Sequence, residues 1–137
     1  MSRYHFQPIQ GQGRTILDTV LASPEFADCT LKEKLTFRLV CEEIIMNIIF
    51  YAYPDDVEGF LDVDIQKTDR IAISFKDAGV PFNPLERKKP DTTLPWKLRH
   101  IGGLGIFLVI KKMDDVRYTY TDNKNVLTIE KVITVKK

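Results

Sequence analysis

The chain contains the stretch Glu42-Glu43-Ile44-Ile45-Met46-Asn47-Ile48-Ile49-Phe50-Tyr51-Ala52-Tyr53. It is mostly apolar and long enough for several helical turns, so we predict a helix buried deep in the fold. Glu43 and Asn47 are four residues apart, which stacks their side chains on one face of that helix. Burying such a pair without partners costs about 1–3 kcal/mol for each unsatisfied group. We therefore expect something polar to meet Glu43 and Asn47.

Composition is that of an ordinary globular protein. The chain has 137 residues, of which 44% are hydrophobic and 28% charged, and its net charge is +1. These values predict one domain over residues 1–137, with no bulk attraction to nucleic acid or to a membrane. The N-terminus lacks the apolar segment of a signal peptide, and the longest apolar stretches are broken by polar residues or too short to span a bilayer. Cys29 and Cys41 lack CxxC spacing, which favours reduced thiols and a cytoplasmic protein.

Local patterns predict the order strand, helix, helix, strand, strand, loop, helix, strand, strand. Thr30 and Glu33 form a capping box that opens the helix ending near Tyr53. Hydrophobic periodicity predicts the remaining strands and helices over residues 4–9, 16–21, 61–66, 71–75, 106–113, 116–120 and 126–135. Turns are predicted at 68–69 and 122–125. Strand pairs joined by short turns favour an α+β two-layer sandwich, in which a mixed, mostly antiparallel sheet carries its helices on one face.

Three polar clusters contain the candidate residues for binding and catalysis. Asn47 can give its amide oxygen to Mg²⁺, while Glu43 can act as a general base. Asp77 can accept a hydrogen bond from an exocyclic amine such as that of adenine, and Gly79 lets a base approach the backbone. Glycines 102, 103 and 105 precede a helix, where backbone amides and the helix dipole favour phosphate. Each cluster alone also fits a structural role: helix capping, a simple turn and a loop-to-helix hinge.

The order of the three clusters resembles that of the Bergerat-fold (GHKL) ATPases, and within them the small bacterial anti-sigma factor serine/threonine kinases. Glu43 to Asn47 is similar to the N box of that superfamily. Residues 77–82 and 100–106 resemble its first and second glycine boxes, and residues 113–128 resemble the C-terminal pattern of the kinases. The resemblance covers about residues 12–135. No GxxxxGK[ST] motif occurs, which excludes a P-loop.

This resemblance implies a set of roles for the site. Asn47 would hold Mg²⁺, Asp77 would read the adenine amine of ATP, and Thr128 would support the same adenine site from the last strand. Residues 83–101 would form the ATP lid, from which Arg99 could reach a terminal phosphate, although a charged loop is also commonly just solvated. The residues that would surround the phosphates are Gly102, Gly103, Leu104 and Gly105.

The resemblance also implies a function. A carboxylate at Glu43 suits transfer to a serine or threonine hydroxyl, whereas sensor histidine kinases usually carry Asn at that position. We therefore expect a protein serine/threonine kinase that phosphorylates an anti-anti-sigma factor of the STAS fold and alternately binds a sigma factor. The alternative is a non-catalytic, nucleotide-gated module that sequesters a sigma factor or another regulator. Family members commonly form homodimers.

Overall fold

The computed structural model describes residues 1–7, 9–53, 59–81 and 104–134. The expected lid at 83–101, with Arg99, and the glycines Gly102 and Gly103 lie outside the described residues. The elements in chain order are β1 (Ser2–Phe6), α1 (Gly13–Leu21), a short 3₁₀ helix η1 (Pro24–Phe26), α2 (Leu31–Tyr51), β2 (Leu61–Lys67), β3 (Arg70–Asp77), α4 (Leu104–Lys112), β4 (Asp115–Thr121) and β5 (Lys124–Val132).

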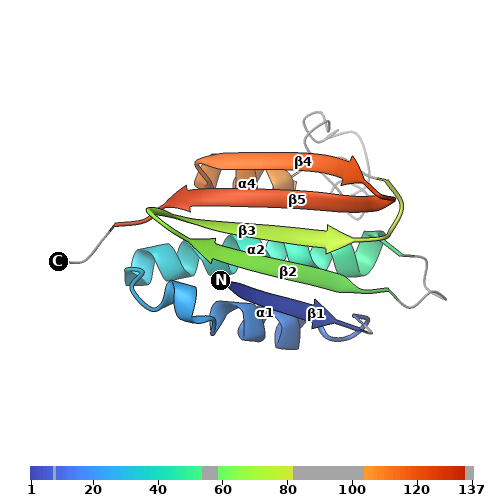
Figure 1. Ribbon diagram of the computed structural model, residues 1–137, viewed down its shortest axis with the longest axis horizontal. Helices are drawn as coiled ribbons and strands as arrows, with labels where there is room; N and C mark the ends of the chain where they lie inside the picture. The colour runs from blue at the N-terminus through green and yellow to red at the C-terminus, as the bar shows by residue number, and fades with distance from the viewer. Residues whose placement is uncertain (8, 54–58, 82–103, 135–137) are drawn as a thin grey trace.

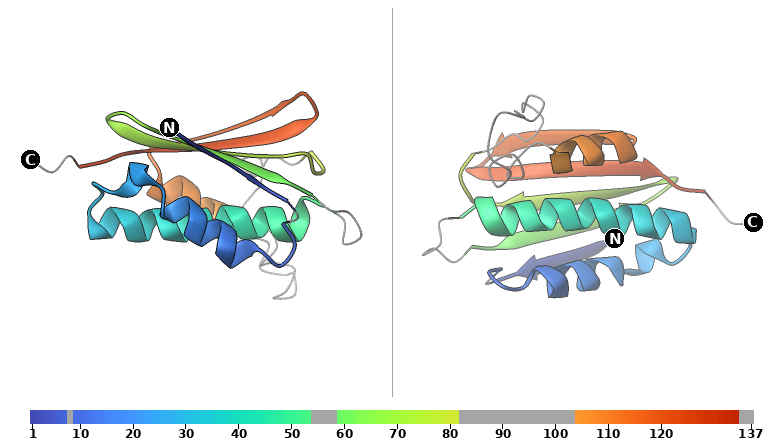
Figure 2. Two further views of the ribbon diagram at one scale, coloured as in Figure 1. Left: turned by 60° about the horizontal axis from the view of Figure 1, so that its bottom comes forward. Right: turned by 180° about the vertical axis from the view of Figure 1, so that it is seen from behind.

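A five-stranded sheet in the order β1-β2-β3-β5-β4 forms one layer (Figure 1). Every neighbouring pair of these strands is antiparallel, where the sequence allowed a mixed sheet. The helices cover one face only, with α2 lying between α1 and α4 (Figure 2). The predicted α+β two-layer sandwich is confirmed. No helix among the described residues is long and apolar enough to cross a membrane.

The hairpin between β4 and β5 turns at two residues. Asp122 and Asn123 have positive φ angles of 54° and 61°, the conformation that a two-residue hairpin turn of type I′ requires. The sequence predicted a four-residue turn over 122–125. In the structure β5 already begins at Lys124, so Asn125 is part of the sheet and pairs with Tyr120 on one side and Asp77 on the other.

The core lies between the sheet and the helices. Alternating residues of β2 and β3 face it, and α2 starts at the predicted capping box, where Thr30 and Glu33 each accept a hydrogen bond from the other's backbone amide. The prediction that the stretch from Glu42 to Tyr53 is buried deep in the fold holds for Ile44, Ile45 and Ile49 and is wrong for Phe50. Phe50 is 60% exposed, because the helices form a single layer that leaves one side of α2 in solvent.

Candidate functional site

The C-terminal end of α2 meets the turn that follows β3. The amide of Val80 donates to the carbonyl of Ala52, at an N···O distance of 3.0 Å. Gly79 lies so close to this carbonyl that an added Cβ would be 2.1 Å from the Ala52 oxygen. The sequence predicted that this glycine lets a base approach the backbone. In the structure, Gly79 lets the turn after β3 pack against the end of α2.

Asp77 is the last residue of β3, and its carboxylate is buried, with only 5% of the residue exposed. One oxygen, Oδ1, accepts from the Gly79 amide at 2.9 Å and from the Asn125 carboxamide at 3.0 Å. The other oxygen, Oδ2, has no partner among the described residues. Burial raises the pKa of Asp77, and the hydrogen bonds from Asn125 and Gly79 oppose that rise. The site thus offers a buried acceptor with spare capacity.

Asn125 is a site residue that the sequence analysis missed. Its Nδ2 donates to Asp77 Oδ1 and, at 3.0 Å, to the carbonyl of Val80. The hydroxyl of Tyr118 on β4 donates to its Oδ1. The run from Asp122 to Asn125 has the composition of a turn, which concealed the strand start. Assigning Asp122 and Asn123 alone to a type I′ turn would have placed Asn125 in the sheet.

Tyr53 is a second residue that the sequence did not single out for the site. Its hydroxyl accepts from the Ala78 amide at 2.8 Å and donates to the Phe60 carbonyl at 2.9 Å. Its ring packs so closely on Gly59 that a Cβ there would come within 2.1 Å of it. Burial raises the pKa of the Tyr53 phenol. Tyr53 therefore ties the residue after Asp77 to the chain leading into β2.

Glu43 and Asn47 lie one turn apart on α2, as predicted, and both are half-buried. In the described parts of the chain neither side chain makes a hydrogen bond or an ion pair. Asn47 precedes Ala52 by five residues, which is about 7–8 Å along the helix axis. The polar pair therefore lies within a few turns of the point where the Asp77 turn docks.

The remaining predicted residues divide between the two faces of the sheet. Leu104 and Gly105 begin α4, which packs beside α2 and runs in the opposite direction (Figure 2). Thr128 pairs with Ser74 in the sheet register, and their hydroxyls are 2.9 Å apart. Side chains alternate along a strand, so Thr128 faces away from the helices while Asp77 and Asn125 face towards them. The structure does not bring Thr128 to the Asp77 side.

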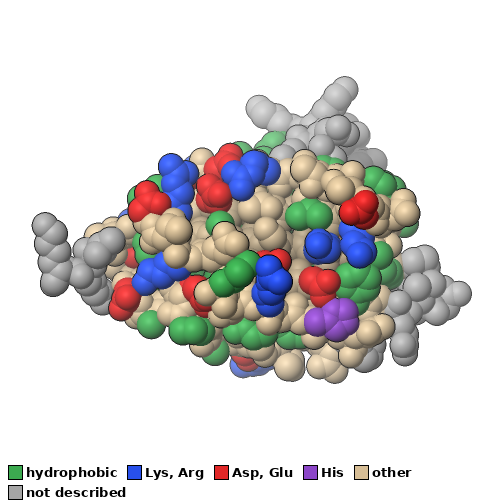
Figure 3. Space-filling model, in the orientation of Figure 1, with side chains coloured by type: hydrophobic (Ala, Val, Ile, Leu, Met, Phe, Trp, Pro, Cys, Tyr) green, Lys and Arg blue, Asp and Glu red, His purple; other side chains and the backbone are tan. Residues whose placement is uncertain are grey.

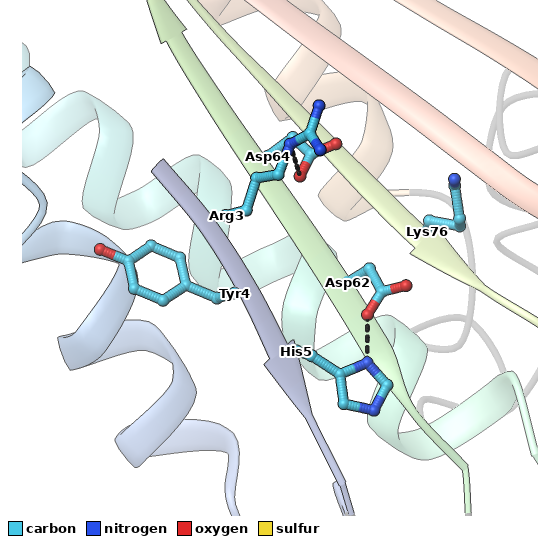
Figure 4. Close-up of a pocket in the computed structure, with 6 residues that line it drawn as sticks. All are labelled: Arg3, Tyr4, His5, Asp62, Asp64 and Lys76. Atoms are coloured by element: carbon cyan, nitrogen blue, oxygen red, sulfur yellow. Dashed lines mark hydrogen bonds and ion pairs between the residues drawn. The ribbon is translucent and has the colours of Figure 1, made fainter. Parts of the chain in front are cut away.

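The open face of the sheet carries interspersed acidic and basic side chains (Figure 3). A hollow on this face lies among Arg3, His5, Asp62, Asp64 and Lys76 (Figure 4). His5 bonds to Asp62, and the Arg3 guanidinium is 3.7 Å from Asp64. These opposite charges largely cancel. The hollow therefore lacks the net positive field of a phosphate site.

The comparison with known families decides the classification. A family model described as the histidine kinase-like ATPase domain matches residues 9–131. The chain belongs to this family. The resemblance to anti-sigma factor kinases of the histidine kinase-like group is confirmed by relatives that carry the name serine-protein kinase RsbW.

Two such relatives come from Bacillus cereus and Listeria monocytogenes. The former is 31% identical over 94 residues and the latter 27% identical over 95 residues. Each alignment covers 66% of this chain, and the chain spans 59% and 60% of the relatives' length. Among solved structures, the RsbU and RsbW domains of Rv1364c from Mycobacterium tuberculosis match 97% of this chain and 33% of that chain. The TM-score is 0.62 at 12% identity, a likeness that supports the fold.

Proposed function

We propose that this domain binds ATP and Mg²⁺ and transfers the terminal phosphoryl group to a serine or threonine of a STAS-type anti-anti-sigma protein. The observation that carries the proposal is the Asp77 carboxylate, which is buried and keeps Oδ2 without a partner in the described structure. A buried acceptor left unpaired costs free energy, and a ligand N–H removes that cost. The exocyclic amine of adenine is such a donor.

Asn47 suits a magnesium ion that is held mainly by phosphates and water. Its amide oxygen is a hard ligand, and no described partner competes for it. Within the residues that the structure describes, no three His, Cys, Asp or Glu side chains gather into a metal site. A protein contribution limited to Asn47 is typical of Mg²⁺ bound together with a nucleotide. The first turn of α4 supplies backbone amides for the phosphates.

Glu43 is the residue we assign to proton transfer. It is half-buried one turn before Asn47, so its carboxylate lies beside the expected metal ligand on the same helix. ATP, when bound, supplies the phosphoryl group. Glu43 orients the acceptor hydroxyl and accepts its proton as the oxygen attacks, while positioning and electrostatics provide most of the acceleration. The relatives named serine-protein kinase support this chemistry.

The partners follow from the same relatives. We propose that the domain alternates between a STAS-domain antagonist and a sigma factor in the cytoplasm, with phosphorylation of the antagonist as the switch. The match to a chain that carries both RsbU and RsbW domains supports a partner-switching pathway. Direct contact with nucleic acid or with a membrane plays no part in this proposal.

The test is transfer of labelled phosphate from Mg²⁺-ATP to a panel of purified STAS-domain proteins. Glu43→Ala should abolish transfer and leave ATP affinity largely intact. The matched control is Glu42→Ala, because Glu42 is the exposed neighbour on the same helix. Retained transfer by Glu43→Ala would refute the base assignment. Nucleotide-dependent binding of a partner without any transfer by the wild-type protein would select the non-catalytic module instead.

Nucleotide binding is tested separately. Asp77→Asn should weaken ATP binding by roughly tenfold to a hundredfold, the effect of losing a hydrogen bond to a charged acceptor. Isothermal titration with Mg²⁺-ATP measures this directly. An unchanged affinity would show that the nucleotide does not bind at Asp77.

A further inference from the structure

The two oxygens of the Asp77 carboxylate have different surroundings. Oδ1 receives two protein donors, the Gly79 amide and the Asn125 carboxamide. Oδ2 receives none from the described residues. A ligand that reaches Asp77 therefore meets one defined acceptor rather than a carboxylate free to rotate.

The carboxamide of Asn125 is held in one orientation by its own partners. Tyr118 donates its hydroxyl hydrogen to Oδ1 of Asn125, so the amide nitrogen must point the other way. The two hydrogens on that nitrogen then have two acceptors at 3.0 Å, Asp77 Oδ1 and the carbonyl of Val80. A flipped amide would set its oxygen against both of these acceptors. The orientation is therefore determined by the network.

We propose that Asn125, oriented by Tyr118, is a specificity-determining residue. Asn125 occupies Oδ1 of Asp77, so the ligand meets only Oδ2, which is an acceptor. The site therefore selects 6-aminopurine over 6-oxopurine nucleotides. The inference rests on the proposed binding of a purine nucleotide at Asp77. Asn125 acts through Asp77 and is a positioning residue.

The physical reason is the difference between the two purine edges. A 6-amino group presents hydrogens to the carboxylate, whereas a 6-oxo group presents an oxygen and is repelled. The repulsion disappears when the carboxyl is protonated, because an acid O–H can donate to the carbonyl. Burial raises the pKa of Asp77, and the Asn125 hydrogen bond opposes that rise. Losing this bond therefore favours the protonated form that accepts the wrong purine.

Few other groups bear on the ionisation of Asp77. From the end of α2 the ionisable side chain bonded into this region is Tyr53, and from β4 it is Tyr118. Both are phenols, a side-chain type that is uncharged at neutral pH. Among the described contacts, the turn after β3 contributes the Gly79 amide and β5 contributes the Asn125 carboxamide.

The experiment compares the affinities for ATP and for ITP, which carries a 6-oxo group in place of the 6-amino group. The wild-type protein should prefer ATP. Asn125→Leu should reduce the ATP-to-ITP affinity ratio by about tenfold or more, and Tyr118→Phe by about threefold, as expected for losing a charged and a neutral hydrogen bond. Tyr120→Phe is the matched control, because Tyr120 is an exposed tyrosine two residues along the same strand. An unchanged ratio in both folded variants would overturn the proposal.

A second measurement separates this inference from the proposed function. The titration of Asp77, followed by carboxyl ¹³C chemical shift without nucleotide, should move to a higher pKa in Asn125→Leu than in the wild type. Asn125→Ser, which keeps a hydroxyl donor, should recover part of the shift. An unmoved titration would refute the positioning role even if ATP binds. A nucleotide affinity insensitive to Asp77→Asn would instead refute the proposed function. If Asn125→Leu fails to fold, Tyr118→Phe decides the outcome.

Discussion

Replacing Gly79 by alanine should destabilise the protein because the new methyl group has no space. Its Cβ would lie 2.1 Å from the carbonyl oxygen and 2.6 Å from the carbonyl carbon of Ala52. Both atoms belong to the backbone at the end of α2, so no side chain can rotate to relieve the contact. The φ angle of Gly79 is not in the left-handed region, and the predicted effect is therefore steric rather than conformational.

The magnitude follows from two losses. Overpacking of a closed contact costs about 1–3 kcal/mol. Moving the turn away also breaks the hydrogen bond from Val80 to Ala52, worth about 0.5–1.5 kcal/mol. The expected decrease in the free energy of unfolding is thus about 2–4 kcal/mol. Because the displaced turn carries Asp77, the affinity for ATP should fall as well.

Urea denaturation followed by circular dichroism measures this change, and Gly11→Ala provides the control. Gly11 has a φ of 75° and no atom within 4 Å of its added Cβ, so its substitution reports backbone strain without a clash. Strain of this kind costs about 1 kcal/mol. A Gly79→Ala protein at least as stable as Gly11→Ala would refute the packing of the turn after β3 on the end of α2. Adding Ala52→Gly should not rescue Gly79→Ala, because the clash is with the carbonyl of residue 52 and not only with its methyl group.

Two further predictions concern ionisable groups in the core. Burial alone would raise the pKa of Glu33, but the hydrogen bonds from the Thr30 and Thr134 amides outweigh it and hold the pKa below its usual value. The Glu33 carboxylate therefore stabilises the fold at pH values above the ordinary carboxyl pKa. This stabilisation is lost as the pH falls through the lowered pKa of Glu33 in the folded protein. Glu33→Gln should therefore cost about 1–3 kcal/mol at neutral pH, and the difference from wild type in urea melts should shrink as the pH falls below the ordinary carboxyl pKa. Burial raises the pKa of the Cys41 thiol to about 12, so iodoacetamide should not alkylate Cys41 in the folded protein at mildly alkaline pH. Mass spectrometry that finds Cys41 labelled as fast as in urea would contradict its placement in the core.

Local patterns were sufficient for most of the secondary structure. The capping box at Thr30 and Glu33 depends on residues three apart, and the strands around Val63 and Ile73 show the alternation of a half-buried sheet. Such signals arise within one element and need no knowledge of neighbours. The spacing of Glu43 and Asn47 likewise placed both on one face of α2. The exposure of Phe50 was mispredicted because it depends on how many helices pack beside α2.

Only part of the hydrogen-bond network around Asp77 could be predicted from the sequence. The sequence singled out Asp77 and Gly79, but it assigned Asn125 to a turn and placed Thr128 near adenine. Asn125 and Thr128 face opposite sides of the sheet, because side chains on a strand alternate between its faces. A shift of the strand pairing by one residue would exchange the two sides. The register follows from the two-residue turn at Asp122 and Asn123 and from the pairing of β5 with β3.

By itself the sequence determined the family of folds, the placement of Glu43 and Asn47 on one face of α2, and the position of Asp77 at the end of β3. Each of these follows from patterns among residues that are close together along the chain. Tertiary structure alone decided which oxygen of Asp77 stays open, that Asn125 bonds the other and is itself bonded by Tyr118, and that Gly79 is needed where the turn after β3 meets the end of α2. The contacts of Asp77 with Asn125 and of Gly79 with Ala52 join residues that are far apart in the sequence. They exist only once the sheet register and the position of α2 are set.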